Sequence, residues 1–123
     1  YLCGITAKPP HREIQKTALG ATQSVTWKYF PSTSIAVSEL KDEGYKIIAV
    51  EQAEGSVALQ NLHIDDGQRY ALIFGHEVNG VDQEILNNCD FCVEIPQFGT
   101  KHSFNIAISV GIVLWELYKK RPL

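Results

Sequence analysis

Short apolar runs alternate with helical stretches along the whole chain. The apolar runs are rich in β-branched and aromatic residues and are bounded by Gly, Pro or Asp, which is typical of β-strands. The predicted strands are Tyr1–Ile5, Val25–Phe30, Lys46–Val50, Tyr70–Phe74 and Phe91–Ile95. Within them, Ile47–Val50 and Ala71–Phe74 are apolar at every position, so we expect central strands that are covered on both faces.

The stretches between these runs have helical patterns that stop at glycine. Residues His11–Leu19 follow a Pro-Pro pair and stop at Gly20, and Ser34–Glu43 stops at Gly44. Glycine is the usual residue just after a helix because it adopts the left-handed conformation without steric cost. A short helix is also expected at Gln83–Asn88. Alternating strands and helices predict an α/β fold with a mostly parallel sheet flanked by helices.

The C-terminal apolar run is the clearest helix in the sequence. It extends from Phe104 to Tyr118, with Ser103 as the expected N-cap and the basic residues Lys119–Arg121 at its C-terminal end. Its apolar side chains fall on nearly every face, and such a helix is buried either in its own domain or against a partner. In a chain of 123 residues an interface with a second copy is the more economical explanation, so the helix predicts a homodimer.

Length and composition fit one compact domain, and we expect a single domain over residues 1–123. No apolar stretch is long enough to cross a bilayer, and the first residues do not resemble a signal peptide. We therefore expect a soluble, cytoplasmic protein with no membrane partner. The formal net charge of −3 argues mildly against a dedicated nucleic-acid binder, so any attraction to RNA must come from local basic clusters.

The cysteines of the chain are Cys3, Cys89 and Cys92. Cys89 and Cys92 have the C-x-x-C spacing of redox and zinc sites, but Cys92 falls in an apolar run and no second pair completes a zinc site. We therefore expect buried thiols in a reducing compartment, and no metal.

Two glycine-containing loops follow predicted strands: FGHEVNG at Phe74–Gly80 and IPQFGTKHSFN at Ile95–Asn105. In an open α/β sheet, the loops beyond the carboxyl ends of the strands are the usual ligand site. Ser103 and Asn105 can hydrogen-bond a ribose or phosphate at the start of the last helix. A plain N-cap is the better local explanation for Ser103, whereas Asn105, a polar residue in an apolar helix, needs a partner. His76 is best explained as an ordinary loop histidine.

Together the two loops resemble the second and third signature motifs of the SpoU (TrmH-like) branch of the SPOUT methyltransferases. Those motifs usually read FGNE-G-x-G and IPM-x-G-x-x-x-SLNVSVAAGI-x-LYE, against FGHEVNG and IPQFGTKHSFNIAISVGIVLWE here. The stretch IIAVEQAEGSVAL resembles a further cofactor-contacting segment. The resemblance covers essentially the whole chain and is most specific over Tyr70–Glu116.

The sequence departs from the family pattern at three places in these loops. His76 replaces the usual asparagine, Val78 a common glycine and Gln97 a frequent methionine. The family's first motif, which contains the arginine often assigned as catalytic, has no match. We therefore expect a catalytic domain that is truncated at its N-terminus, ahead of Tyr1.

The resemblance implies an RNA ribose 2′-O-methyltransferase that acts on tRNA or rRNA and uses S-adenosyl-L-methionine. It also implies a deep C-terminal trefoil knot and a homodimer formed through the last helix. Glu77, Ser103 and Asn105 match positions important for catalysis in the family. The residues that the resemblance places at the cofactor are Ala49, Glu51, Gly75, Glu77, Gly80, Ile95, Pro96, Phe104 and Asn105.

Basic residues suitable for RNA phosphates occur in two places. Lys101 and His102 lie beside the implied ribose site, while Lys8 and Arg12 follow the first strand, where a solvated helix face explains them equally well. The alternative function is a noncatalytic dimeric RNA-binding or ribosome-associated protein on the same fold. The acidic charge, the altered FGHEV and the missing first motif favour that alternative slightly, but the intact SFN and IP-x-x-G sequences favour the enzyme more strongly.

Overall fold

The computed structural model describes residues 1–76, 78–100 and 104–121. The chain forms two compact units, Tyr1–Glu39 and Leu40–Leu123. The first unit contains a two-stranded sheet and the second a four-stranded sheet. The expectation of a single domain over residues 1–123 stays a prediction.

The larger unit is built on a sheet in which every described strand pairing is parallel. Its strands are β3 (Lys46–Val50), β4 (Val57–Ala58), β5 (Tyr70–Phe74) and β6 (Phe91–Glu94), in the spatial order β4-β6-β3-β5. Val50 pairs with both Phe74 and Val93, so the carboxyl ends of β3, β5 and β6 meet at one edge of the sheet. The predicted mostly parallel α/β sheet is therefore confirmed.

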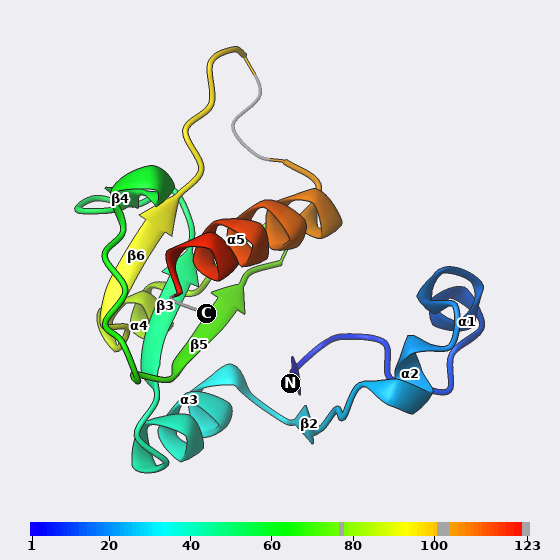
Figure 1. Ribbon diagram of the computed structural model, residues 1–123. Coiled ribbons are helices and arrows are strands. Elements are labelled where there is room, and N and C mark those ends of the chain that lie inside the picture. Colours follow the sequence, from blue (N-terminus) through cyan, green and yellow to red (C-terminus); the bar gives the residue numbers. More distant parts are fainter. Residues whose placement is uncertain (77, 101–103, 122–123) are drawn as a thin grey trace. The chain divides into compact units, whose positions relative to one another are not determined.

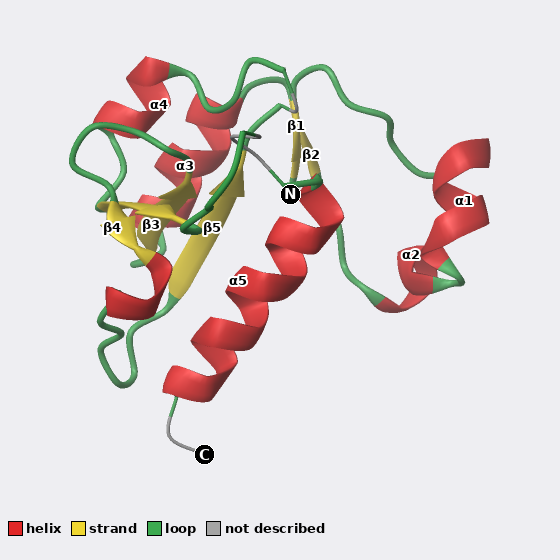
Figure 2. Cartoon of the chain, turned by 90° about the horizontal axis from the view of Figure 1, so that it is seen from above, coloured by secondary structure: helices red, strands yellow, loops and turns green. Residues whose placement is uncertain are grey.

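Helices cover both faces of this sheet. Figures 1 and 2 show α5 (Ile106–Lys120) over one face and the short α4 (Gln83–Asn87) on the other. The core under α5 joins strands, the turn η1 (Leu59–Asn61) and the helix, and its buried members are Ile48, Leu59, Leu62, Val93 and Val113. Ile47 and Ala49 alternate with Ile48 and therefore point to the opposite face. All three are fully buried, as the unbroken apolar run of β3 predicted.

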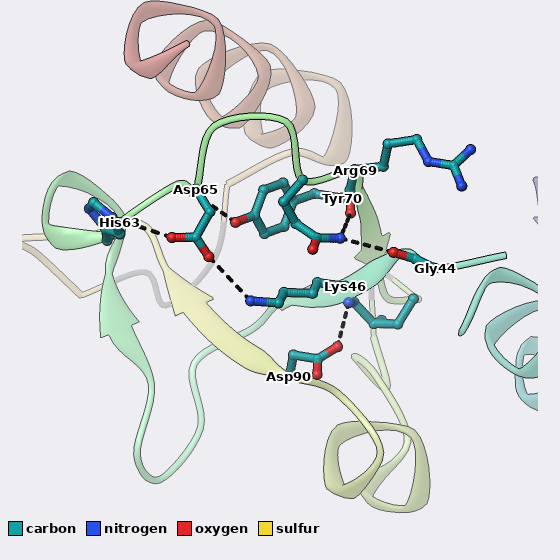
Figure 3. A network of polar contacts seen from close by, with 9 residues as sticks. Gly44, Lys46, His63, Asp65, Arg69, Tyr70 and Asp90 are labelled. Carbon is teal, nitrogen blue, oxygen red and sulfur yellow. Dashed lines mark hydrogen bonds and ion pairs between the residues drawn. The ribbon is translucent and has the colours of Figure 1, made fainter. Parts of the chain in front are cut away.

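The amino end of the sheet is held by polar contacts (Figure 3). The Asp90 carboxylate accepts the N–H of buried Ile47 at 2.7 Å, and the Asp90 N–H donates to the Ile47 carbonyl at 2.9 Å. The Tyr70 hydroxyl accepts the N–H of Asp65 at 2.9 Å. Lys46 Nζ lies 3.2 Å from the Asp65 carboxylate, which pairs the first residue of β3 with the loop before β5.

The smaller unit has a minimal sheet, in which β1 (Leu2–Cys3) lies parallel to β2 (Tyr29–Phe30). The chain between them contains α1 (Arg12–Ala18) and α2 (Ala21–Ser24), and α3 (Thr33–Asp42) follows β2. The Tyr29 hydroxyl donates to the Gly4 carbonyl at 2.8 Å, and Lys8 Nζ lies 4.0 Å from the centre of the Tyr29 ring.

The bounds of two strands were predicted to the residue, but Ala71–Phe74 was wrongly expected to be central and covered on both faces: β5 lies at an edge of the four-stranded sheet and is only partly buried. Several other boundaries also differ from prediction. β3 and β5 have the predicted bounds, whereas β1 and β2 are each only two residues long. β1 ends at Cys3, just before Gly4, whose φ of +71° leaves the extended conformation. α5 begins at Ile106 rather than at Phe104, and its N-cap is Asn105 rather than Ser103. β4 and η1 were not predicted.

The apolar surface of α5 is only partly covered by its own chain. Val113 is 1% exposed, whereas Ile108 and Trp115 are 54% and 60% exposed. The apolar pattern of this helix is thus not explained by the core of its own unit. No helix in the described part of the chain has the length and apolar content needed to cross a membrane.

Candidate functional site

A cavity of about 500 Å³ opens at the carboxyl edge of the four-stranded sheet. The ends of β3, β5 and β6, the loop after β5 and the start of α5 form its wall, which is the ligand position expected for an open α/β sheet. Its described lining residues are Val50, Glu51, Gln52, Phe74, Gly75, His76, Val78, Gly80, Glu94, Ile95, Gln97, Phe104, Asn105, Ile106 and Ser109.

The loop after β5 folds back on itself beside this cavity. The N–H of His76 donates to the Gly80 carbonyl at 3.1 Å, and the N–H of Gly80 donates to the His76 carbonyl at 2.8 Å. His76 Nδ1 accepts the N–H groups of Val78 at 3.1 Å and Asn79 at 3.4 Å. An asparagine side chain closes turns in the same way, which gives a physical reason for histidine at this motif position. His76 is thus a loop histidine whose ring closes the turn.

Two positions of this loop require glycine, Gly75 because of close backbone contacts and Gly80 because of its left-handed conformation. A Cβ on Gly75 would lie 2.3 Å from the Gly80 carbonyl carbon and 2.5 Å from the Val81 nitrogen, both of which are backbone atoms. Gly80 has a φ of +67°, and a Cβ there would lie 2.4 Å from Oε2 of Glu51. Glycine is the one residue that permits both the close approach and the left-handed conformation without strain.

Glu51, the residue just after β3, links three segments at this edge. Its N–H donates to the Val93 carbonyl at 3.0 Å, and its carbonyl accepts a hydrogen bond from the Cys92 thiol at 3.4 Å. Its carboxylate accepts the N–H of Val81 at 3.0 Å. Glu51 therefore joins the end of β3 both to β6 and to the loop after β5.

Asn105 lies where α5 meets the cavity. Its side-chain oxygen accepts the N–H of Ala107 at 2.9 Å, so the partner that this polar side chain was predicted to need is the helix backbone. Ser109 follows one turn later on the same helix face and also lines the cavity. Ser109 and Glu94 were missed in the sequence; the available signals were the four-residue spacing from Asn105 and the place of Glu94 just before the Ile95-Pro96 pair.

The described wall carries the carboxylates of Glu51 and Glu94, and none of its described lining residues is a lysine or arginine. Such a wall favours a cationic ligand over an anionic one.

The two thiols of β6 and its preceding turn do not add a nucleophile. Burial, followed by nearby negative charge, raises the pKa of both Cys89 and Cys92 above the usual value, and each thiol donates to a backbone carbonyl. Among the described residues there is no cluster of metal-binding side chains.

The structure brings most of the described cofactor candidates together. Glu51, Gly75, Gly80, Ile95, Phe104 and Asn105 all line the cavity. Ala49 is fully buried within β3, and Pro96 lies between two lining residues without lining the cavity itself. Lys8 and Arg12 belong to the smaller unit. Glu77, Lys101, His102 and Ser103 lie outside the described residues.

An open parallel sheet with a cavity at the carboxyl ends of its strands defines an α/β ligand-binding domain. The chain belongs to the SpoU rRNA Methylase family, whose family model matches residues 1–115. The resemblance predicted from the two motif loops is thereby confirmed.

Relatives of known name match most of this chain. The tRNA (guanosine(18)-2'-O)-methyltransferase of Borreliella burgdorferi is 33% identical over 113 residues, which are 92% of this chain and 51% of that protein. The 23S rRNA (guanosine-2'-O-)-methyltransferase RlmB of Neisseria meningitidis is 32% identical over 110 residues, which are 89% of this chain and 43% of that protein. The chain thus spans about half the length of these relatives, or less.

Solved structures of methyltransferases share the fold. The AdoMet-bound rRNA methyltransferase from Sinorhizobium meliloti matches with a TM-score of 0.87 and 27% identity, over 96% of this chain and 44% of that one. The A. aeolicus TrmH/SpoU tRNA modifying enzyme matches with a TM-score of 0.79 and 25% identity, over 97% of this chain and 61% of that one. These matches confirm the α/β fold with a mostly parallel sheet and flanking helices.

Proposed function

We propose that the protein transfers a methyl group from S-adenosyl-L-methionine to a ribose 2′-hydroxyl of tRNA or rRNA. The observation that carries this proposal is the meeting of the two motif loops, FGHEVNG and IPQFGTKHSFN, at one cavity. The names of the relatives, which specify guanosine 2'-O-methylation in tRNA and in 23S rRNA, support the reaction and the class of substrate.

The cavity fits the cofactor in size, charge and surface. Its volume of about 500 Å³ falls within the range of roughly 300–1,000 Å³ that is usual for small-molecule sites. Glu51 and Glu94 suit a ligand with a positive sulfonium and a positive ammonium group. Phe74, Ile95 and Phe104 offer apolar surface to an adenine ring. We propose that Gly75 and Gly80 leave room for backbone contacts to the ligand, and that Ala49 and Pro96 contribute through their backbone.

When bound, the cofactor supplies an electrophilic methyl group whose leaving group is neutral. Little acid catalysis is therefore needed, and the protein has to align a weakly acidic hydroxyl and assist its deprotonation. We propose that Asn105 aligns the ribose. The Ala107 N–H holds its amide oxygen, which fixes the plane of the amide and leaves the NH₂ group to donate to the substrate.

Other residues of the proposed site are assigned by the family resemblance. We propose that Glu77 and Ser103, which lie outside the described residues, complete the catalytic site. Lys101 and His102 would bind RNA phosphates beside it, and Lys8 and Arg12 would bind phosphates from the smaller unit. The free thiols of the chain are consistent with the reducing cytoplasm, where we place the protein.

We further propose a homodimer formed through α5. Ile108, Ile112 and Trp115 follow the spacing of one helix face, and their exposed side chains form an apolar stripe. The family resemblance also leads us to infer that the C-terminal segment is threaded as a deep trefoil knot.

Sedimentation velocity tests the dimer: Trp115→Glu should give monomers, whereas the control Glu84→Gln in α4 should leave the dimer intact. A dimer that survives Trp115→Glu would place the interface elsewhere.

The function is tested by cofactor titration and by methyl transfer with the whole protein. We expect saturable calorimetric binding of S-adenosyl-L-methionine and radiolabel transfer from it to tRNA or rRNA, with a 2′-O-methylated nucleoside recovered after digestion. Asn105→Ala should abolish transfer and also destabilise α5 by about 0.5–2 kcal/mol, because the cap is lost. Asn105→Ser keeps a capping oxygen but lacks the NH₂ group, so it should lose transfer while staying stable.

Each outcome of this test separates the candidate functions. Cofactor binding without transfer to any RNA would contradict the enzyme and favour the noncatalytic RNA-binding protein. Full transfer by Asn105→Ser would contradict the ribose-aligning role of Asn105 and leave the rest of the proposal standing.

A further inference from the structure

We propose that Glu51 is a positioning residue for the cofactor site, because its carboxylate holds the loop after β5 in the shape that leaves the cavity open. The inference rests on the proposed function for the identity of the ligand. The hydrogen bond between the Glu51 carboxylate and the Val81 N–H is formed within the protein and does not depend on which ligand binds.

The direction of the Glu51 side chain is fixed by the sheet. The residue is anchored on both sides of its backbone, by its N–H to Val93 and by its carbonyl to the Cys92 thiol, and both partners belong to β6. Its carboxylate then reaches the N–H of Val81 at 3.0 Å. Hydrogen bonds that involve an ionised group are about twice as strong as neutral ones. Glu51, at the end of β3, therefore fixes the position of Val81, where the loop after β5 returns to the sheet.

Gly80 has no room for a side chain beside the Glu51 carboxylate. Oε2 of Glu51 occupies the space that a Cβ of Gly80 would need, at 2.4 Å. On another side, the Cβ position of Gly75 lies 2.3 Å from the Gly80 carbonyl carbon. Glycine at both positions therefore lets the loop approach the carboxylate and return beside its own first residue, and both of these glycines line the cavity.

Glu51 could instead act only through its charge, opposite a cationic ligand. The two roles predict different behaviour for the glutamine and alanine variants. Glutamine has the same shape and keeps an oxygen that accepts the Val81 N–H, but it carries no charge. Alanine removes both the acceptor and the charge. A positioning role is rescued by glutamine, and a purely electrostatic role is not.

The test uses the whole protein with Glu51→Gln, Glu51→Ala, and Glu54→Ala as a control on the exposed surface three residues further along. Hydrogen exchange of the peptide that contains Val81 reports the contact, and calorimetry reports the dissociation constant for S-adenosyl-L-methionine. Glu51→Ala should speed exchange at Val81 and weaken binding roughly 10- to 100-fold, as expected when a hydrogen bond to a charged group is lost. Glu51→Gln should keep the Val81 amide protected and lose less than about 10-fold in affinity, because the neutral acceptor keeps the hydrogen bond at about half its strength while the charge opposite the ligand is lost.

A double-mutant cycle with Gly80→Ala sharpens the test. Alone, Gly80→Ala should weaken binding, because its Cβ meets the carboxylate. In the Glu51→Ala background that space is vacant, so the same substitution should cost less, although the strain of its positive φ remains. If Glu51→Ala does not fold, exchange at Val81 and affinity are compared between the parent, Glu51→Gln and Gly80→Ala.

The proposal is overturned if Glu51→Ala exchanges like the parent at Val81, or if Glu51→Gln loses as much affinity as Glu51→Ala while Val81 stays protected. The second result would assign Glu51 a purely electrostatic role. Failure of the proposed function is seen separately: a parent protein that binds no S-adenosyl-L-methionine contradicts the methyltransferase, whereas the exchange data still decide whether Glu51 positions the loop.

Discussion

At the amino end of the four-stranded sheet, the Asp90 carboxylate accepts the N–H of Ile47 at 2.7 Å; at the carboxyl end, the Glu51 carboxylate accepts the N–H of Val81 at 3.0 Å. The two contacts have the same chemistry but join different parts. Asp90 connects the chain just before β6 to a buried residue of the central strand, whereas Glu51 connects that strand to a loop beside a cavity. One kind of interaction thus stabilises the sheet at one end and shapes a binding site at the other. Substitutions at the two ends should therefore separate stability from affinity.

The largest effect is expected from Gly75→Ala at the carboxyl end. Its Cβ would meet the backbone of Gly80 and Val81, which cannot move aside as a flexible side chain can. Overpacking of this kind costs about 1–3 kcal/mol, so the affinity for S-adenosyl-L-methionine should fall by up to about 100-fold. Calorimetric titration measures this loss, and thermal unfolding shows how much of the cost falls on stability.

The matched control is Gly67→Ala, in the loop before β5 at the amino end. Gly67 has a φ of +75°, but its Cβ would meet no atom within 4 Å. The strained backbone should lower the stability by about 1–2 kcal/mol and leave the affinity unchanged. Equal losses of affinity in the two glycine variants would contradict the separation between the ends.

The next largest effect is expected from Asp90→Ala. The change leaves the N–H of Ile47 buried without its acceptor, which costs about 1–3 kcal/mol. Asp90→Asn keeps an oxygen acceptor and should recover most of that stability. Urea unfolding measures the free energy, and cofactor titration should give dissociation constants within about twofold of the parent for the folded variants. A large loss of affinity in Asp90→Ala would mean that the two ends are coupled.

The core of the larger unit could be predicted from the sequence, because it depends on local pattern. An unbroken apolar run such as Ile47–Val50 fits a strand that is covered on both faces, and β3 has the predicted bounds. β4, two residues long, has too little sequence to show a period. The reciprocal contact of Asp90 with Ile47 joins positions 43 residues apart, and the strand register that brings them together does not show in either local sequence.

The site was predictable only in part, for a related reason. The motif spacing indicated the loops that line the cavity; Gly75 proves to be required by close backbone contacts and Gly80 by its positive φ. The choice of N-cap was wrong because Ser103 and Asn105 are equally good capping residues. The structure places Asn105 at the cap, where its side-chain oxygen accepts the N–H of Ala107. His76 likewise revealed its role only through the N–H groups that point at its ring.

The two thiols near β6 should each respond most to the carboxylate at their own end. Burial is the largest cause that raises the pKa of each. At Cys89 the neighbouring Cys92 also raises the pKa, Lys41 lowers it and Asp90 raises it; at Cys92, Glu51 is the next cause that raises it. Because the thiolate is the reactive form, alkylation of both thiols should require a higher pH than alkylation of a fully exposed cysteine. Asp90→Asn should shift the alkylation profile of Cys89 to lower pH, and Glu51→Gln should do so for Cys92. Peptide mass spectrometry across a pH series measures both, and identical shifts in both variants would contradict the assignment.

The smallest effect is expected from Asp65→Ala at the amino end. Its ion pair with Lys46 spans 3.2 Å between side chains that are 53% and 37% exposed, and such surface pairs contribute about 0–1 kcal/mol. The hydrogen bond from Asp65 to Tyr70 uses the backbone N–H and survives the substitution. Urea unfolding at low and high salt should therefore show a loss below about 1 kcal/mol that shrinks with salt. A loss larger than that of Asp90→Ala would mean that exposed charge, rather than a satisfied buried N–H, stabilises this end of the sheet.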